Sequence, residues 1–241
     1  SCNKVIMDKF KVVVADPPWG GWNDKLKMSD VPRGADANYK TLSIDDIKKI
    51  PVQSICDSSG AVLALWAPSS ILQDGLDVMK SWGFNHKQTY IWVKNKKISL
   101  NLSLIKTLKK QFKNKTIDKA DLFEFLSNNE VELDAVLSMY LGRLFRQTHE
   151  ICLIGTNNNK IYKSLKNKSM RSVSFGQNLK HSAKPDHLQD SLNLMFPGCA
   201  KIELFSRREK SGWYTVGNEN PSTYGEDIFV SLEKIRLLQE K

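Results

Sequence analysis

Short apolar runs alternate with amphipathic segments along most of the chain. Runs with two apolar faces are typical of strands buried in a parallel sheet, whereas apolar spacings of three and four residues predict helices. This alternation predicts an α/β fold built on a doubly wound, mainly parallel sheet with helices on both faces. We expect strands at 12–15, 61–66, 88–94, 150–155 and 200–205, and helices at 186–195 and 226–241.

Two further helices have recognisable beginnings. Ser43 and the acids after it form an N-cap signature for a short helix that Pro51 ends. Ser69 or Ser70 is expected to cap a helix that runs through Lys80.

A helical segment at about 98–138 interrupts the series of strands. Apolar residues recur there at helical spacing, first around Leu108 and then after Asp118, which we expect to cap a second helix. The same spacing continues from Val131 to Leu144. We interpret this segment as an insertion within one domain that covers residues 1–241.

The most distinctive stretch follows the first predicted strand. That strand, 12–15, ends in Asp16, Pro17, Pro18 and Trp19, and open α/β sheets bind ligands at the carboxyl ends of their strands. The two prolines fix φ and donate no backbone hydrogen bond, so we expect a rigid tip whose carbonyl oxygens point outward unpaired. A simpler interpretation is a proline-rich turn that places Trp19 in the core.

Two fixed acceptors and a stacking surface suit methyl transfer to the exocyclic amine of a nucleobase. The lone pair of such an amine is delocalised into the ring, which makes the nitrogen a poor nucleophile. If the Asp16 carboxylate and the carbonyl of Pro17 or Pro18 accept the two N–H groups, the lone pair turns toward an electrophilic methyl group. These acceptors would also stabilise the developing positive charge, and Trp19 would stack on an extruded base.

The formal net charge of +10 at pH 7 is concentrated in two blocks. Residues 94–115 contain eight lysines and no acid, and residues 160–184 contain six lysines, one arginine and no acid. Such blocks attract phosphates through counterion release, although a solvated, lysine-rich surface gives the same pattern. Two blocks together with the candidate base-binding tip favour a nucleic-acid partner.

Composition narrows the class of protein further. The four cysteines are widely separated, which indicates neither a disulfide framework nor a metal site and suggests a reducing compartment. No stretch has the apolar length of a membrane span. The sequence contains no Pro-Cys pair, which disfavours a cytosine-C5 methyltransferase, whose chemistry needs a cysteine nucleophile.

Several motifs occur in the order and spacing of the MT-A70 methyltransferases, which the chain resembles over most of residues 10–219. They are Asp16-Pro17-Pro18-Trp19, Trp92-Val93-Lys94, Thr148-His149-Glu150, His181-Ser182-x-Lys184-Pro185-Asp186, Pro197-Gly198-x-x-Lys201-x-Glu203-Leu204-Phe205-x-Arg207-Arg208 and Gly212-Trp213 with Gly217-Asn218-Glu219. The resemblance implies a Rossmann-like fold. It also implies transfer of a methyl group from S-adenosylmethionine to N6 of adenine in DNA or RNA.

The resemblance assigns catalytic and substrate-binding roles to individual residues. Asp16 would accept the target N6–H, and Trp19 would form a wall of the base pocket. Tyr39 and Lys94 would contact the substrate, Tyr39 from a loop that closes over the site.

A second set of residues would bind the cofactor, S-adenosylmethionine. Lys184 would pair with its methionine carboxylate. Phe205 and Arg207 would lie beside the cofactor at the tip of the fifth predicted strand. Asn218 and Glu219 would hydrogen-bond the ribose hydroxyls.

Three functional interpretations remain at this stage. The first is a DNA N6-adenine methyltransferase, the second is the same reaction on RNA, and the third is a catalytically silent subunit that binds nucleic acid. The intact catalytic motif, together with Lys184 and Asn218-Glu219, argues against the silent subunit.

The resemblance also implies an assembly. We expect a nuclear, or otherwise cytoplasmic, heterodimer with an inactive MT-A70 relative, with further DNA-binding subunits. The inserted helices and an apolar stripe of the last helix are candidate interfaces. The stripe comprises Ile228, Leu232, Ile235 and Leu238. Packing of the stripe in the core is the alternative.

Overall fold

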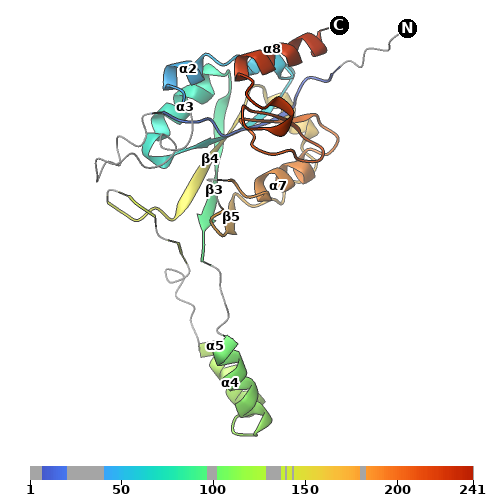
Figure 1. Ribbon diagram of the computed structural model, residues 1–241. Helices are drawn as coiled ribbons and strands as arrows, with labels where there is room; N and C mark the ends of the chain where they lie inside the picture. Colours follow the sequence, from blue (N-terminus) through green and yellow to red (C-terminus); the bar gives the residue numbers. More distant parts are fainter. Residues whose placement is uncertain are drawn as a thin grey trace.

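A computed structural model describes residues 7–20, 41–96, 102–128, 137–138, 140–142, 144–179 and 183–240. Over these ranges seven strands form one sheet in the order β5-β3-β4-β2-β1-β6-β7 (Figure 1). The strands are β1 Val12–Ala15, β2 Val62–Ala67, β3 Asn85–Lys94, β4 His149–Thr156, β5 Val173–Gly176, β6 Lys201–Leu204 and β7 Tyr214–Val216. The α-helices are α2 Ile44–Lys48, α3 Leu72–Ser81, α4 Leu102–Lys113, α5 Lys119–Asn128, α7 His187–Met195 and α8 Ile228–Gln239.

Strand β4 runs against the other strands described in this sheet. β1 pairs in parallel with β2 and β6, β6 with β7, and β3 with β5. β4 is antiparallel to both of its neighbours, β2 and β3. The predicted mainly parallel α/β sheet is therefore confirmed, and the antiparallel direction of β4 is a feature that the sequence did not predict. The chain leaves β3 and returns to β4 at the same edge, so this connection does not have to cross the sheet.

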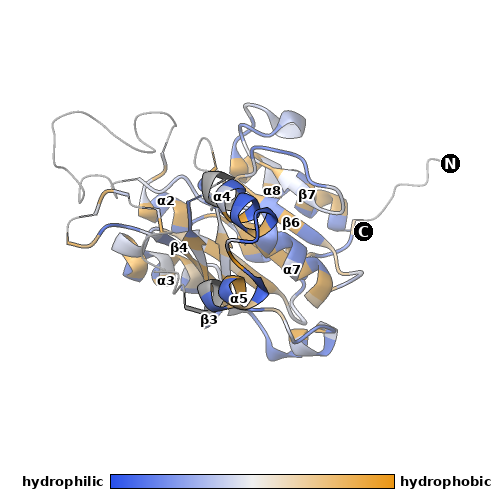
Figure 2. Ribbon diagram, turned by 90° about the horizontal axis from the view of Figure 1, so that it is seen from below, coloured by the Kyte–Doolittle hydropathy of each residue, from blue (hydrophilic) through white to orange (hydrophobic). Residues whose placement is uncertain are grey.

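Alternate residues of β1 face two separate cores. Val13 and Ala15 pack with α2, α3 and α8, whereas Val12 and Val14 pack with α7. All four side chains are at most 2% exposed, which explains why the strand is apolar on both faces. Figure 2 shows the apolar residues concentrated in the sheet and on the sides of the helices that lie against it.

The helix beginnings follow the predictions in two of three cases. The Ser43 hydroxyl accepts a backbone N–H in the first turn of α2, and the Asp118 carboxylate does the same for α5. Neither Ser69 nor Ser70 caps α3. A 3₁₀ turn occupies 69–71 instead, and Ile71, which then precedes α3, makes no capping bond through its side chain.

The insertion is helical at α4 and α5, which stand apart from the sheet in Figure 1. The predicted helical continuation from Val131 to Leu144 is wrong where the structure describes it. Leu137 forms an antiparallel bridge with Asn95, and Tyr140 forms one with Gln147. Among the apolar residues that the structure describes here, Leu137 and Tyr140 are half-buried, and Leu141 and Leu144 are exposed.

The last helix, α8, is part of the core. Ile228, Leu232 and Ile235 are at most 7% exposed and pack in the same core as β1. This arrangement confirms the core-packing alternative for most of the stripe, whereas Leu238 is 48% exposed. No helix in the described ranges has the length and apolar content needed to cross a membrane.

Candidate active site

The reversed direction of β4 brings its first residues to the edge where the parallel strands end. The register places Glu150 opposite Trp92, near the end of β3. Lys94 is the last residue of β3, and Asp16 directly follows β1 at the same edge. Charged residues from distant parts of the chain therefore meet at one edge of the sheet.

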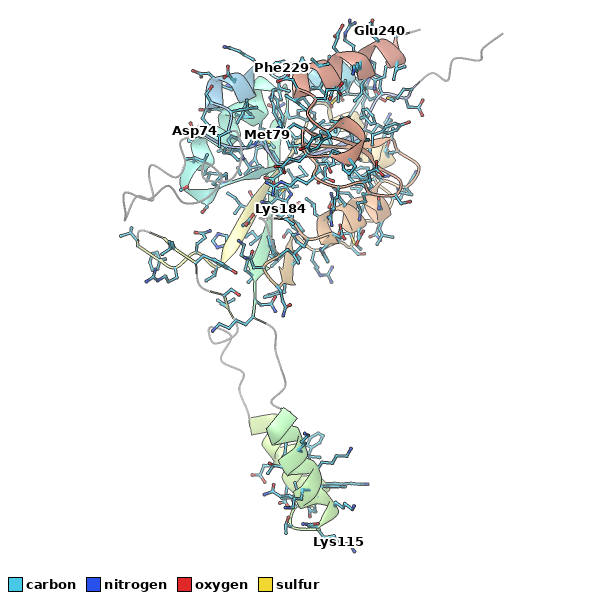
Figure 3. The ribbon with its side chains drawn as sticks, viewed as in Figure 1. Asp74, Met79, Lys115, Lys184, Phe229 and Glu240 are labelled. Atoms are coloured by element: carbon cyan, nitrogen blue, oxygen red, sulfur yellow. The ribbon has the colours of Figure 1, made fainter. Side chains whose placement is uncertain are left out.

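Four charged side chains at this edge form a continuous series of ion pairs. Lys184 Nζ lies 3.2 Å from Asp16 Oδ2 and 2.9 Å from Glu150 Oε2. The other carboxylate oxygen of Glu150, Oε1, lies 2.6 Å from Lys94 Nζ. The four side chains are between 11% and 29% exposed, and Figure 3 shows Lys184 beside the sheet. We call this series, Asp16–Lys184–Glu150–Lys94, the ion-pair chain.

Aromatic rings fix both lysines of the ion-pair chain. Lys94 Nζ lies 5.1 Å from the ring centroid of Trp92 and 4.6 Å from that of Tyr140. Lys184 Nζ lies 5.5 Å from the ring centroid of Trp66. The negative face of an aromatic ring attracts a cation, so each ammonium group is held by rings as well as by carboxylates.

The pKa values of the two acids in the ion-pair chain are shifted in opposite directions. Burial raises the pKa of Asp16, and the Lys184 cation opposes this shift without cancelling it. Burial acts in the same direction on Glu150, but the cations of Lys184 and Lys94 outweigh it and lower the pKa of this acid. Burial disfavours charge on Lys184, but Asp16 and Glu150 outweigh it and raise its pKa. Asp16 is therefore the acid with the raised affinity for a proton.

The tip after β1 is fixed by backbone hydrogen bonds. The Trp19 N–H donates to the Pro17 carbonyl and the Leu42 N–H to the Pro18 carbonyl, both at 2.9 Å. The prediction that these carbonyls are unpaired was wrong, because a parallel bridge between Trp19 and Leu42 ties the tip to the segment before α2. A carbonyl oxygen has two lone pairs, so each retains capacity for one further bond.

Trp19 lies in the core. Its side chain is 4% exposed, and its indole N–H donates to the Trp66 carbonyl at 3.0 Å. This is the placement that the simpler interpretation expected, and a role for Trp19 in walling the base pocket stays a prediction. Tyr39, the other aromatic residue assigned to the substrate, lies outside the described residues.

The loops after β6 and β7 contact each other closely. Phe205 has φ of 60°, a left-handed conformation that costs energy for a residue other than glycine. The Ser206 N–H donates to the Val216 carbonyl at 2.9 Å. A Cβ at Gly217 would lie 2.3 Å from the Ser206 carbonyl oxygen, so this approach requires glycine.

These two loops carry most of the predicted cofactor residues. Arg207 Nε lies 3.1 Å from Glu219 Oε2. Asn218 is exposed, and its carbonyl accepts the Gly225 N–H at 2.7 Å. Because β6 pairs with β1, the structure brings these residues and Phe205 to the edge that holds the ion-pair chain.

Two acids were given no role by the sequence analysis. Glu150 completes the ion-pair chain, and Glu203 on β6 pairs in register with Val14 of β1. Glu203 Oε2 is buried and has no hydrogen-bond partner among the described residues. Burial raises the pKa of Glu203 to about 7; Arg208 opposes this effect, and Asp16 adds to it. The available signal was that both acids lie within the motifs of the sequence, Thr148-His149-Glu150 and Lys201-x-Glu203.

Comparisons with known proteins agree with the motifs at this edge. The family model described as MT-A70 matches residues 10–120 and 126–219. An N(6)-adenosine-methyltransferase MT-A70-like protein of Drosophila melanogaster is 24% identical over 216 residues, which are 89% of this chain and 27% of that protein. The human N(6)-adenosine-methyltransferase catalytic subunit METTL3 is also 24% identical over 216 residues, 89% of this chain and 29% of its own length.

A bacterial relative matches over a larger share of its own length. The type II methyltransferase M.MunI of Mycoplasma sp is 24% identical over 227 residues, which are 88% of this chain and 78% of that protein. By contrast, the chain spans less than a third of the insect and human relatives. The family model covers most of the chain, including the whole candidate active site, and the chain belongs to the MT-A70 family of methyltransferases.

Proposed function

We propose that this chain transfers a methyl group from S-adenosylmethionine to N6 of adenine in a nucleic acid. The observation that carries the proposal is the placement of Asp16 at the tip after β1, held by Lys184 and possessing a raised proton affinity. The names of the relatives, N(6)-adenosine-methyltransferase and type II methyltransferase, support this reaction class.

Asp16 acts on the target amine. Its carboxylate accepts one N6–H, which turns the nitrogen lone pair toward the methyl group. As positive charge develops on N6, the adjacent carboxylate stabilises it. The proton that N6 loses passes to Asp16, whose raised pKa makes it a stronger base than an ordinary aspartate. Lys184 keeps the carboxylate oriented during these steps.

The residues at this edge fit S-adenosylmethionine, which supplies an electrophilic methyl group when bound. Lys184 uses two of its three N–H donors on Asp16 and Glu150, which leaves the third for the methionine carboxylate. The unpartnered oxygen of Glu203 needs a donor, and the ammonium group of the cofactor is of the required charge. Glu219 offers a carboxylate for the ribose hydroxyls.

We favour DNA as the substrate and keep RNA as the second candidate. DNA is favoured because M.MunI, of which this chain covers 78%, is a type II methyltransferase. RNA is retained because the other relatives named above are N(6)-adenosine methyltransferases.

We further propose that the chain works in the nucleus as a heterodimer with an inactive MT-A70 relative. Leu141, Leu144 and Phe145 support an interface, since they are 54%, 93% and 87% exposed. They lie on the turn between Tyr140 and Gln147, whose backbones exchange hydrogen bonds of 3.0 and 3.1 Å. Exposed apolar residues grouped on one turn are typical of a surface that a partner covers.

Replacing Asp16 with Asn should abolish most of the methyl transfer. Asn keeps the shape of the side chain but removes the charge and the base, so the rate should fall on the order of 10²–10³-fold. Mass spectrometry of N6-methylated nucleosides, after incubation with matched DNA and RNA oligonucleotides, measures the product and identifies the substrate. Retained turnover in the Asp16→Asn variant would refute the role of Asp16, and a wild-type chain that methylates neither oligonucleotide, with or without its partner, would refute the proposed function.

Lys184→Gln and the double variant Asn218→Ala with Glu219→Ala should bind S-adenosylmethionine more weakly. Each loses a charged or charge-assisted contact, worth roughly 1.5–3 kcal/mol, which corresponds to roughly 10- to 100-fold in Kd. Titration calorimetry measures the affinity, and thermal unfolding confirms that each variant folds. Lys87→Gln, exposed near the start of β3, is the control. Wild-type affinity in both variants would place the cofactor elsewhere.

Glu203 should make the wild-type protein less stable as the pH rises. Its folded-state pKa of about 7 lies above the ordinary value of 4.5, so ionisation opposes folding. The free energy of unfolding is therefore unaffected by Glu203 below about pH 4.5. It decreases between about pH 4.5 and pH 7, by on the order of 2–3 kcal/mol. Urea unfolding at a series of pH values should show this loss in the wild type relative to Glu203→Gln. Parallel pH profiles for the two proteins would contradict the assignment.

Replacing both Leu144 and Phe145 with Ser should weaken association with a co-expressed MT-A70 relative. The substitution removes the apolar surface that the partner would cover. The variant heterodimer should therefore dissociate at a higher protein concentration than the wild type, as measured by light scattering. The exposed pair Tyr162→Ser with Leu194→Ser on other elements is the control. Equal effects of the two pairs would exclude this turn as the interface.

A further inference from the structure

Four lysines lie along one side of α4. They are Lys106, Lys109, Lys110 and Lys113. The last three follow Lys106 by three, four and seven residues, and this spacing places all four on one face of the helix. All four are exposed, and the sequence of α4 contains no acid. We call these four residues the lysine stripe.

The lysine stripe and the apolar residues of α4 occupy different sides of the helix. Leu108 and Phe112 lie two and six residues after Lys106, which puts them on the opposite side of the helix. Leu108 is half-buried, and Phe112 is 42% exposed. The helix is thus amphipathic, with its cations on the side turned away from its apolar residues.

The nearby acids of the second inserted helix have other contacts. Asp118 and Asp121 each accept the backbone N–H of the other at the start of α5, at 2.9 and 2.8 Å. Within the described residues, no carboxylate pairs with a lysine of the stripe. The positive charge of the stripe is therefore not compensated by this part of the protein.

The insertion that carries the stripe emerges from the edge of the sheet that holds the candidate active site. It leaves β3 after Lys94 and re-enters the sheet at His149, the residue before Glu150. The Ser138 N–H donates to the Lys94 carbonyl at 2.8 Å, which anchors the returning segment beside the ion-pair chain. Figure 1 shows α4 and α5 projecting away from this end of β3 and β4.

We propose that the lysine stripe of α4 binds the phosphate backbone of the nucleic acid whose adenine reaches Asp16. This inference rests on the proposed function, since it names a contact of the same substrate. Lysine ammonium groups act as point charges for phosphates. At about 1.5 Å per residue the stripe is about 10 Å long. This length matches about three nucleotides of one strand, which rises about 3.4 Å per nucleotide.

The test compares two variants of the full chain that lose the same charge. The stripe variant replaces its four lysines with glutamine, which has a similar helix propensity. The control variant makes the same change at four exposed lysines that lie outside both basic blocks of the sequence, Lys9, Lys49, Lys80 and Lys87. Circular dichroism and thermal unfolding check that both fold. If the stripe variant unfolds, Lys109→Gln with Lys113→Gln replaces it, and half of the effect is expected.

Fluorescence anisotropy between 50 and 200 mM salt measures binding to duplex DNA and to single-stranded RNA. For each phosphate that no longer pairs with a lysine, the slope of log K against log salt should become shallower by about 0.9 on duplex DNA or about 0.7 on a single strand. The stripe variant should also raise the KM for the oligonucleotide at least tenfold, with kcat at saturation within about twofold of the wild type.

Two results would overturn this inference. One is an equal salt slope for the stripe and control variants, and the other is a decrease in kcat without a change in KM. The binding measurement does not depend on catalysis. A wild-type chain that binds with a steep slope but transfers no methyl group would therefore refute the proposed function while the slopes still decide the role of the stripe.

Discussion

The Lys184 ammonium is the contact on which the candidate active site depends. It joins Asp16 and Glu150, two partly buried acids that would otherwise repel each other and resist ionisation. Removing one partner of a buried ion pair leaves an uncompensated charge. This destabilises a protein more than replacing the whole pair with apolar residues does. Charge compensation here is also uneven. Glu150 has two cations and a lowered pKa, whereas Asp16 has one and a raised pKa. The same network therefore keeps Glu150 ionised and makes the Asp16 carboxylate a stronger base. Paired acids with different pKa values commonly have different roles.

The ion-pair chain requires the reversed direction of β4. A strand of eight residues is roughly 26 Å long at about 3.3 Å per residue. If β4 ran parallel to β2, Glu150 would lie at the other end of that length and could not reach Lys184 or Lys94. Antiparallel neighbours can be joined by a short turn, so this pairing does not require the insertion. It does place both ends of the insertion at the edge of the sheet that holds Glu150.

Local patterns predicted the parts of this structure that depend on local physics. Apolar runs located β1 and β2, and the short-range hydrogen bond of Ser43 was readable from the sequence because donor and acceptor are three residues apart. The direction of β4 was not readable, since a buried strand has the same apolar pattern in either direction. Strand β7 has only three residues, which is too short for a periodic signal.

The candidate site was predicted as a set of residues but not as an arrangement. The motifs identified Asp16 and Lys184, yet nothing in the sequence states that residues so far apart share an ion pair. The carbonyl of Pro18 looked unpaired because its donor, the Leu42 N–H, belongs to a residue far along the sequence. Burial of Trp19 likewise depends on its bond to Trp66, a contact between two strands' ends that composition cannot reveal.

The structure also changes the meaning of the net charge. The two basic blocks of the sequence include Lys94 and Lys184, whose charges are used within the ion-pair chain and face carboxylates. The second block begins at Lys160, after β4, and therefore at the edge opposite Asp16. A count of lysines thus overstates the positive charge that is free to meet an outside partner. The lysines of α4 belong to an inserted helix outside the ion-pair chain, so under the proposed function substitutions there should change substrate affinity and leave the contacts of Asp16 intact.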